Sequence, residues 1–205
     1  MELPSLPTSE TCLSCRGCCI FLSSDSPWIP YFRSEEIKQA IEAGVSPDAF
    51  SSTQGSHIIP VSLFRESHKS APLWQLATPY GASSGDRVCC PALDPKTHHC
   101  MIYDVRPLDC FIYPFVLMWD SDQTVIFLAL HEACPFVLSQ TIPLPEVLVC
   151  RAAELTQMLQ TPQMIESLSA HPGMIMLTQH DTMLMAPLDR LTQALTNPGQ
   201  SQIPR

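Results

Sequence analysis

Four of the ten cysteines in this chain lie close together near the N-terminus. They are Cys12, Cys15, Cys18 and Cys19, in the spacing Cys-x2-Cys-x2-Cys-Cys. Thiolates this close repel one another and oxidise readily, and a bound metal ion or iron–sulfur cluster is the usual means of neutralising them. Each two-residue spacer allows a tight turn that brings two sulfurs to one centre. The run therefore predicts metal ligation by thiolates.

The adjacent pair Cys18 and Cys19 adds a geometric expectation. Successive side chains of an extended segment point to opposite sides. Both sulfurs should therefore not bind one mononuclear ion without distortion. We expect one of them to face a second metal or cluster, or to be a buried thiol.

A second set of cysteines lies far along the chain. Cys90, Cys100 and Cys110 follow at intervals of ten residues, and Cys134 precedes a proline. With the N-terminal run, the candidate metal ligands are Cys12, Cys15, Cys18, Cys19, Cys90, Cys100, Cys110 and Cys134. One all-thiolate zinc site or one cubane cluster requires about four thiolates. The set therefore allows two centres, or one centre with additional redox-active thiols.

Four other potential ligands are expected to have different roles. Cys150 follows an apolar Val-Leu-Val stretch and is predicted to be a core thiol. His98 and His99 lie in a polar loop, where exposure is more common than ligation. His131 is followed by Glu as in the zinc motif H-E-x-x-H, but Pro135 occupies the position of the second histidine, so that motif is absent.

Composition favours a globular protein that binds neither nucleic acid nor membrane. The chain has 205 residues, of which 45% are hydrophobic and 15% charged, which is typical of a core-forming protein. Its net charge of −9 argues against non-specific nucleic-acid binding, which needs a basic surface. No apolar run approaches a membrane span, and the N-terminus lacks a signal-peptide pattern. We therefore expect a cytoplasmic location, where clustered thiols bind metal more often than they form disulfides.

The elements that must position these cysteines predict an α+β fold. The clearest helix is Ser34 to Gly44, with Ser34 as its N-cap and Gly44 at its end. Residues 78–86 are expected to form a loop. Further helices are expected at 145–159, 162–170 and 188–196, buried strands at 57–64 and 124–130, and two short strands within 174–185.

The distribution of cysteines suggests two parts. No cysteine follows Cys150. We expect a small, loop-rich, metal-organised cysteine-cluster domain at residues 1–150, and a C-terminal α/β extension at residues 151–205 packed on it. Because the ligands are distant in sequence, metal binding should be coupled to folding.

The ordered motifs resemble the CxxCxxCC family, the YkgJ-type cysteine-cluster proteins described as zinc- or iron-chelating domains. The motifs that match are Cys12-x2-Cys15-x2-Cys18-Cys19, Cys90-x2-Leu93, Cys100-x-Ile102-Tyr103-x2-Arg106-Pro107-x2-Cys110 and Tyr113-Pro114. The resemblance implies metal or iron–sulfur binding by the matching cysteines. A flagellin lysine N-methylase branch carries a similar cluster, which implies a metal-dependent protein methyltransferase as one alternative.

This chain departs from the family pattern at two positions. Members commonly have arginine after the cysteine matched by Cys110, whereas this chain has Phe111, which removes a cation near the thiolates. The pattern also needs one cysteine where this chain has Cys89 and Cys90, so Cys89 is not expected to be a ligand.

Three residues that neighbour the cysteines in the matching motifs have open roles. Arg106 is expected to compensate thiolate charge or to bind an anion, and the alternative is a surface arginine before a turn. Tyr103 and Tyr113 are expected to exclude water from the site, although packing alone explains them equally well.

The leading expectation is a metal-binding protein that holds an iron–sulfur cluster of the [4Fe–4S] type. Eight cysteines, a vicinal pair and little histidine suit thiolate-only ligation. Zinc is the alternative, because four thiolates are equally natural ligands for it. A third hypothesis is a thiol protein that senses oxidants or delivers metal. The expected partners are the metal or cluster and a protein. The sequence leaves open whether the chain is an enzyme.

Overall fold

The computed structural model describes residues 18–21, 26, 28–53, 73–76, 78–79, 88–94, 96–97, 99–140 and 144–197. Cys12 and Cys15, together with the strand expected at 57–64, lie outside these residues. Within the described ranges, helices accompany three antiparallel sheets of three strands each, which confirms the mixed α+β class. None of the helices in these ranges is long and apolar enough to cross a membrane.

The described residues divide into two compact units, neither of which is a continuous segment. Unit 1 draws its residues from Met1–Gln54, Pro72–Phe111 and Cys134–Phe136. Unit 2 draws its described residues from Ile112–Ala133 and Val137–Arg205. The domain boundary predicted at residue 150 falls inside a helix of unit 2, and it stays a prediction.

Two small sheets form the strand framework of unit 1. One has the order β2 (Tyr31–Phe32), β4 (Leu73–Leu76) and β3 (Phe50–Thr53). The other has the order β1 (Ile20–Phe21), β6 (Val88–Cys89) and β5 (Thr78–Pro79). The loop expected at 78–86 is therefore wrong at its start, because Thr78 and Pro79 pair with β6.

Helix α2 (Ser34–Glu42) confirms the clearest helix prediction but is capped differently. Its N-cap is Arg33 instead of Ser34, and the Arg33 N–H donates to Glu36 Oε2 at 2.8 Å. Glu36, at the third helical position, thus makes the reciprocal bond of a capping box, in which the acid accepts the N–H of the N-cap residue. Gly44 follows with φ +106°, a left-handed conformation that glycine adopts without strain.

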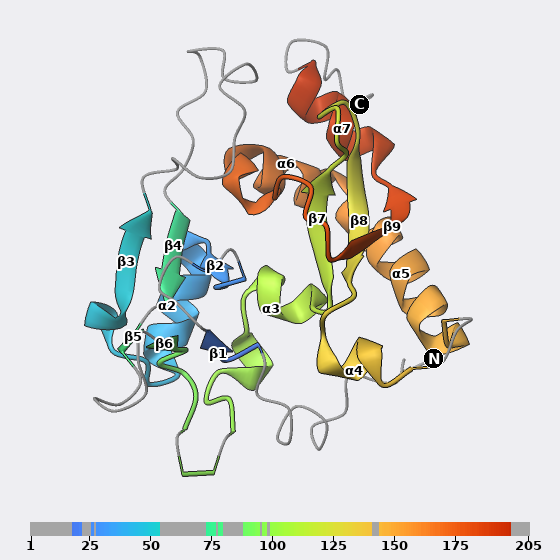
Figure 1. Ribbon diagram of the computed structural model, residues 1–205. Coiled ribbons are helices and arrows are strands. Elements are labelled where there is room, and N and C mark those ends of the chain that lie inside the picture. The colour runs from blue at the N-terminus through green and yellow to red at the C-terminus, as the bar shows by residue number, and fades with distance from the viewer. Residues whose placement is uncertain are drawn as a thin grey trace. The chain divides into compact units, whose positions relative to one another are not determined.

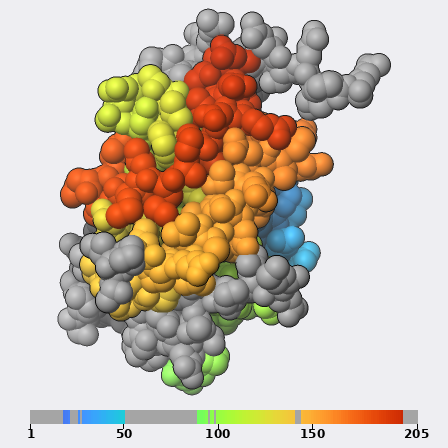
Figure 2. All heavy atoms as spheres, turned by 90° about the vertical axis from the view of Figure 1, so that its right-hand side faces the viewer, coloured from blue at the N-terminus to red at the C-terminus, as the bar shows by residue number. Residues whose placement is uncertain are grey.

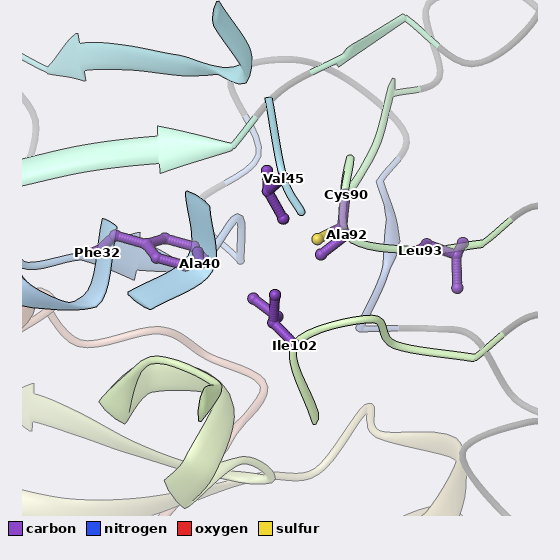
Figure 3. Close-up of a cluster of buried hydrophobic side chains, with 7 residues drawn as sticks. All are labelled: Phe32, Ala40, Val45, Cys90, Ala92, Leu93 and Ile102. Atoms are coloured by element: carbon purple, nitrogen blue, oxygen red, sulfur yellow. The ribbon is translucent and has the colours of Figure 1, made fainter. Parts of the chain in front are cut away.

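The core of unit 1 includes a cysteine. It is built from two segments that are distant in sequence, residues 32–45 and 90–102. Figure 3 shows its seven buried side chains, which are Phe32, Ala40, Val45, Cys90, Ala92, Leu93 and Ile102. Cys19 and Cys100 are partly buried and pack against this group. Because buried cysteine behaves as a small hydrophobe, these thiols add to the core that positions them.

Unit 2 is an antiparallel sheet with helices packed against it. Its strands have the order β7 (Phe115–Trp119), β8 (Ile126–His131) and β9 (Thr182–Pro187) (Figure 1). The strand expected at 124–130 is confirmed as β8, whose residues are nearly all buried. Asp120 closes the β7–β8 turn, since its carboxylate accepts hydrogen bonds from the N–H and hydroxyl of Thr124 at 2.6 and 2.8 Å.

The three C-terminal helices agree closely with the sequence prediction. They are α5 (Glu146–Leu159), α6 (Pro162–Ala170) and α7 (Asp189–Thr196), and Figure 2 shows the face that they form in orange and red. A short helix, α4 (Pro135–Leu138), precedes them. In α5 the buried residues recur at helical spacing, which is the pattern that made the helix predictable.

Of the two strands expected within 174–185, the second forms and the first does not. Only β9 forms there as a strand. Met174 ends a 3₁₀ helix, η4 (Pro172–Met174), and Met176 makes a single parallel bridge to Met118. Both Met174 and Met176 are buried, so these side chains fill the core without belonging to a strand.

We predict that Glu36→Ala lowers the free energy of unfolding by about 3 kcal/mol, because buried donors lose a charged acceptor. Glu36 accepts from the backbone and the guanidinium of Arg33 and from the Leu108 N–H. Urea denaturation at fixed metal content measures the change. Glu35→Ala, at an exposed position in the same helical turn, is the control and should change stability by no more than about 0.5 kcal/mol. Equal effects of the two substitutions would contradict the role of Glu36.

Candidate metal centre

Backbone pairing brings the N-terminal cysteines to the segment that carries Cys90. Strands β1 and β6 pair antiparallel, with Ile20 opposite Cys89. Beyond the strand ends the pairing continues, because the Cys90 N–H donates to the Cys19 carbonyl at 2.8 Å. Cys18 lies in the turn that leads into β1. The order of the ladder thus places the vicinal pair beside Cys90.

A hairpin-like turn returns the chain to the same place at Cys100. Leu93 and Cys100 form an antiparallel bridge, and the Met101 N–H donates to the Ala92 carbonyl at 2.8 Å. The Asp94 N–H donates to the His99 carbonyl at 2.9 Å, which closes the turn. The ten residues between Cys90 and Cys100 therefore form a turn whose two arms are hydrogen-bonded to each other.

Cys110 is held by a short helix that two carboxylates fix to unit 1. Helix α3 (Leu108–Ile112) is far too short to be stable alone. Glu36 Oε1 accepts the Leu108 N–H at 2.8 Å, and Asp109 Oδ2 accepts the Tyr31 N–H at 3.0 Å. Desolvation, with the nearby charge of Glu36, raises the pKa of Asp109 to about 7 against the effect of this hydrogen bond. Both carboxylates therefore orient the first turn of the helix that carries Cys110.

Four thiols from three distant segments share one electrostatic neighbourhood. They are Cys18, Cys90, Cys100 and Cys110, which we call the thiol quartet. In every pair of the quartet, the charge of one thiol raises the pKa of the other. Burial has a larger effect than any of these charges on the pKa values of Cys90, Cys100 and Cys110. Backbone pairing thus brings the turn of Cys18 and Cys19 to Cys90, and ligation of one metal centre by these thiols stays a prediction.

The environment of the thiol quartet favours protonated thiols. Desolvation raises the pKa of Cys90 to about 12 and also raises the pKa of Cys100 and of Cys110. For Cys18, the hydrogen bond with Cys19 is the main cause of a raised pKa, followed by desolvation. Four thiols that resist ionisation in one place are stable only as thiols, or as thiolates whose charge a cation neutralises.

The geometry of the vicinal pair corrects the sequence prediction. Cys18 and Cys19 lie in a turn, not in an extended strand, and their Sγ atoms are 4.0 Å apart. Four sulfurs at about 2.3 Å from a tetrahedral zinc ion would be about 3.8 Å apart. The premise that the two side chains point to opposite sides is therefore wrong, and both sulfurs could reach one ion.

Arg106 supplies positive charge to the quartet and is fixed by aromatic rings. Its guanidinium carbon lies 4.3 Å from the ring centroid of Tyr103 and 5.6 Å from that of Phe111. Its charge lowers the pKa of Cys18 and of Cys100, against larger effects that raise them. Phe111, at the position where the family resemblance implies an arginine, thus lies beside Arg106.

Neither of the two tyrosines expected to exclude water from the site has the position that this role requires. Tyr103 is 37% exposed and packs on Arg106. Tyr113 belongs to unit 2, where its hydroxyl lies 3.1 Å from His131 Nδ1. The sequence motif grouped Tyr113 with the cysteines because it is close to Cys110 in the chain, but the boundary between the units falls between them.

The remaining cysteines have distinct positions. Cys134 is buried and belongs to unit 1 with the quartet, although the residues around its segment belong to unit 2. Cys150 is exposed on α5, so the prediction of a core thiol is wrong. Two residues along a helix turn a side chain by about 200°, which places Cys150 opposite the buried Leu148.

Among the described residues, no group of three or more His, Cys, Asp or Glu side chains is arranged to hold a metal ion as it stands. Cys12 and Cys15 lie outside those residues. The quartet fits a soft, thiophilic metal in donor type. The arrangement is therefore a cluster of ligands that metal binding would have to draw together.

Sequence reasoning missed the two carboxylates that position α3. Glu36 could have been found, because an acid at the third position of a helix is a capping signal. Asp109 adjoins Cys110 and carries no recognisable pattern, since its partner Tyr31 is distant in sequence.

Residues 11–135, more than half of the chain, match the CxxCxxCC family, whose description reads "Putative zinc- or iron-chelating domain". The match spans the thiol quartet and Cys134, and it ends before α5. No curated protein and no solved structure matches the chain significantly.

Proposed function

Because the chain belongs to the CxxCxxCC family, a zinc- or iron-chelating domain, we propose that unit 1 binds an iron–sulfur cluster through cysteine thiolates. The observation that carries the proposal is the backbone pairing that brings the turn of Cys18 and Cys19 to Cys90, and Cys100 back to the same segment. Four thiolates suffice for one [4Fe–4S] cluster. Cys12, Cys15, Cys19 and Cys134 would then be ligands of a second centre, or thiols that exchange with the quartet.

Zinc is a second candidate, and one distance favours it. The 4.0 Å separation between the sulfurs of Cys18 and Cys19 is close to the edge of a zinc–thiolate tetrahedron, at about 3.8 Å. A zinc site would fix the fold of unit 1 without redox chemistry. An iron–sulfur cluster, when bound, would supply electron transfer.

The described residues have defined roles toward either metal. The apolar core around Cys90 excludes water, and Arg106 offsets part of the negative charge of the ligands. Glu36 and Asp109 hold the helix that presents Cys110. A cytoplasmic location, a protein partner and a methylase-like activity are further hypotheses for the same unit.

Metal content decides between the two candidates. The protein purified without oxygen should contain stoichiometric iron and sulfide, with broad visible absorbance near about 400 nm. Colourless protein with tightly held zinc would instead favour the second candidate. Protein that binds neither metal after reconstitution would overturn the proposal.

We predict that Cys110→Ser abolishes stoichiometric metal binding, because it removes one donor from a set of four. Cys150→Ser should leave metal content unchanged, since Cys150 is exposed on a helix of unit 2. Both variants are measured by elemental analysis after identical reconstitution. Equal metal content in the two variants would contradict the assignment of the quartet.

Zinc affinity should rise with pH. The raised pKa values of the quartet mean that the metal-free thiols hold their protons at neutral pH, so zinc must displace them. Lower pH favours the protonated, metal-free state, and the apparent affinity should increase about tenfold per pH unit for each displaced proton. Competition with a chromophoric chelator between about pH 6 and pH 8 measures the slope. An affinity that does not vary with pH would exclude binding through protonated thiols.

Arg106→Gln should weaken zinc binding about tenfold, equivalent to about 1.4 kcal/mol, because it removes a cation that favours the thiolates. Arg106→Lys should have an intermediate effect, since lysine keeps the charge but not the planar packing on two rings. Arg151→Gln is the matched control, as Arg151 lies on α5 in unit 2. The same competition titration reports all three affinities, and an unchanged affinity in Arg106→Gln would remove Arg106 from the site.

A further inference from the structure

A chain of hydrogen bonds in unit 2 joins a phenol, an imidazole and a carboxylate. The Tyr113 hydroxyl lies 3.1 Å from His131 Nδ1, and His131 Nε2 lies 3.2 Å from Asp181 Oδ2. The Tyr113 and His131 rings meet edge-on, with centroids 5.8 Å apart. None of these residues takes part in the metal centre proposed for unit 1.

The backbone fixes this order of side chains. Tyr113 lies just before β7, His131 ends β8, and Asp181 lies just before β9. The His131 N–H donates to the Pro114 carbonyl at 2.9 Å, and the Glu132 N–H donates to the Asp181 carbonyl at 2.9 Å. Because the central strand is bonded on both sides at this end, the imidazole is held between the other two groups.

The bonding pattern assigns the protons. A carboxylate can only accept a hydrogen bond, so His131 Nε2 carries a proton and donates it to Asp181. In a neutral imidazole Nδ1 is then the acceptor, and the Tyr113 hydroxyl donates to it. Desolvation lowers the pKa of His131 despite the opposing effect of Asp181, which supports a neutral ring. His131 is therefore oriented as a base toward the phenol.

We propose that Tyr113 is the nucleophile of a second reactive site, which takes the acyl group of an activated ester or thioester. The Tyr113 oxygen attacks the carbonyl carbon while its proton passes to His131 Nδ1. The bond from that carbon to the leaving alkoxide or thiolate then breaks, and the leaving group takes the proton from the imidazolium. The arrangement meets the geometric rule for an activated nucleophile, a hydroxyl bonded to a base that a third group orients.

Two other tyrosines of the chain, Tyr103 and Tyr31, serve as standards for the acylation rate of Tyr113. Tyr103 is 37% exposed and contacts Arg106, whereas Tyr113 is less exposed. Burial of Tyr31 raises its pKa to about 12, which makes it a weak nucleophile. If exposure alone governed acylation, Tyr103 would react faster than Tyr113. If His131 acts as a base, the order is reversed.

The test treats the full-length protein with p-nitrophenyl acetate and follows acetylation of each tyrosine by peptide mass spectrometry. We expect Tyr113 to react at least about tenfold faster than Tyr103, which is modest for general-base assistance. His131→Asn keeps an acceptor near the position of Nδ1 but removes the base, so the Tyr113 rate should fall below that of Tyr103. The Tyr103 rate should not change, and thermal melting checks the fold of the variant.

Asp181→Asn supplies the test if His131→Asn fails to fold. An amide that donates to His131 Nε2 turns the proton of the imidazole toward Tyr113, so Nδ1 can no longer accept and the Tyr113 rate should fall. Faster acetylation of Tyr103 than of Tyr113, or a Tyr113 rate unaffected by both substitutions, would show that the three residues only stabilise the sheet. Metal content is irrelevant to this outcome, so it is distinguishable from failure of the proposed metal centre.

Discussion

The chemical constraint on unit 1 is that four thiols with raised pKa values occupy one poorly hydrated place. A single buried cysteine is an ordinary apolar residue, but a group whose members oppose ionisation of one another has two stable forms. Either all of them keep their protons, or a cation takes the place of those protons. The small sheets, the short α3 helix and the turn between Cys90 and Cys100 can all be understood as means of gathering these sulfurs. The contacts that gather them are backbone pairings and bonds from two carboxylates to backbone N–H groups.

The carboxylates and the arginine around the quartet have separate tasks. Glu36 and Asp109 bind backbone N–H groups, which fixes α3 without placing a formal cation against the sulfurs. Arg106 lies between aromatic rings, so its charge is positioned by packing and remains directed at the thiols. The two carboxylates thus hold the helix of Cys110, and the charge of Asp109 adds to the effect of burial in raising the pKa of that thiol. The charge of Arg106 acts in the opposite direction on the pKa of Cys18 and of Cys100.

Features that depend on neighbours in sequence could be predicted from the sequence, whereas features that depend on residues far apart in the chain mostly could not. Helices α5 and α6 follow from local periodicity and proline positions, and both were predicted closely. The grouping of Cys18 with Cys90 followed from the cysteine motifs, because ligands of one centre must converge. The exposure of Cys150 was not foreseen, since an apolar neighbourhood in sequence does not say which side of a helix faces the core. The partnership of Tyr113 with His131 and Asp181 depends on strand pairing in space, which no local pattern encodes.

The placement of Cys134–Phe136 has a consequence for how the protein is made. These three residues belong to unit 1, although the segments that flank them on both sides belong to unit 2. During synthesis, unit 1 therefore stays incomplete until the ribosome has also produced β7 and β8, which belong to the other unit. Assembly cannot proceed as one finished unit followed by another, and neither unit can be released by a single cut in the chain. The two units are therefore interleaved along the sequence, and neither can be complete before part of the other has been synthesised.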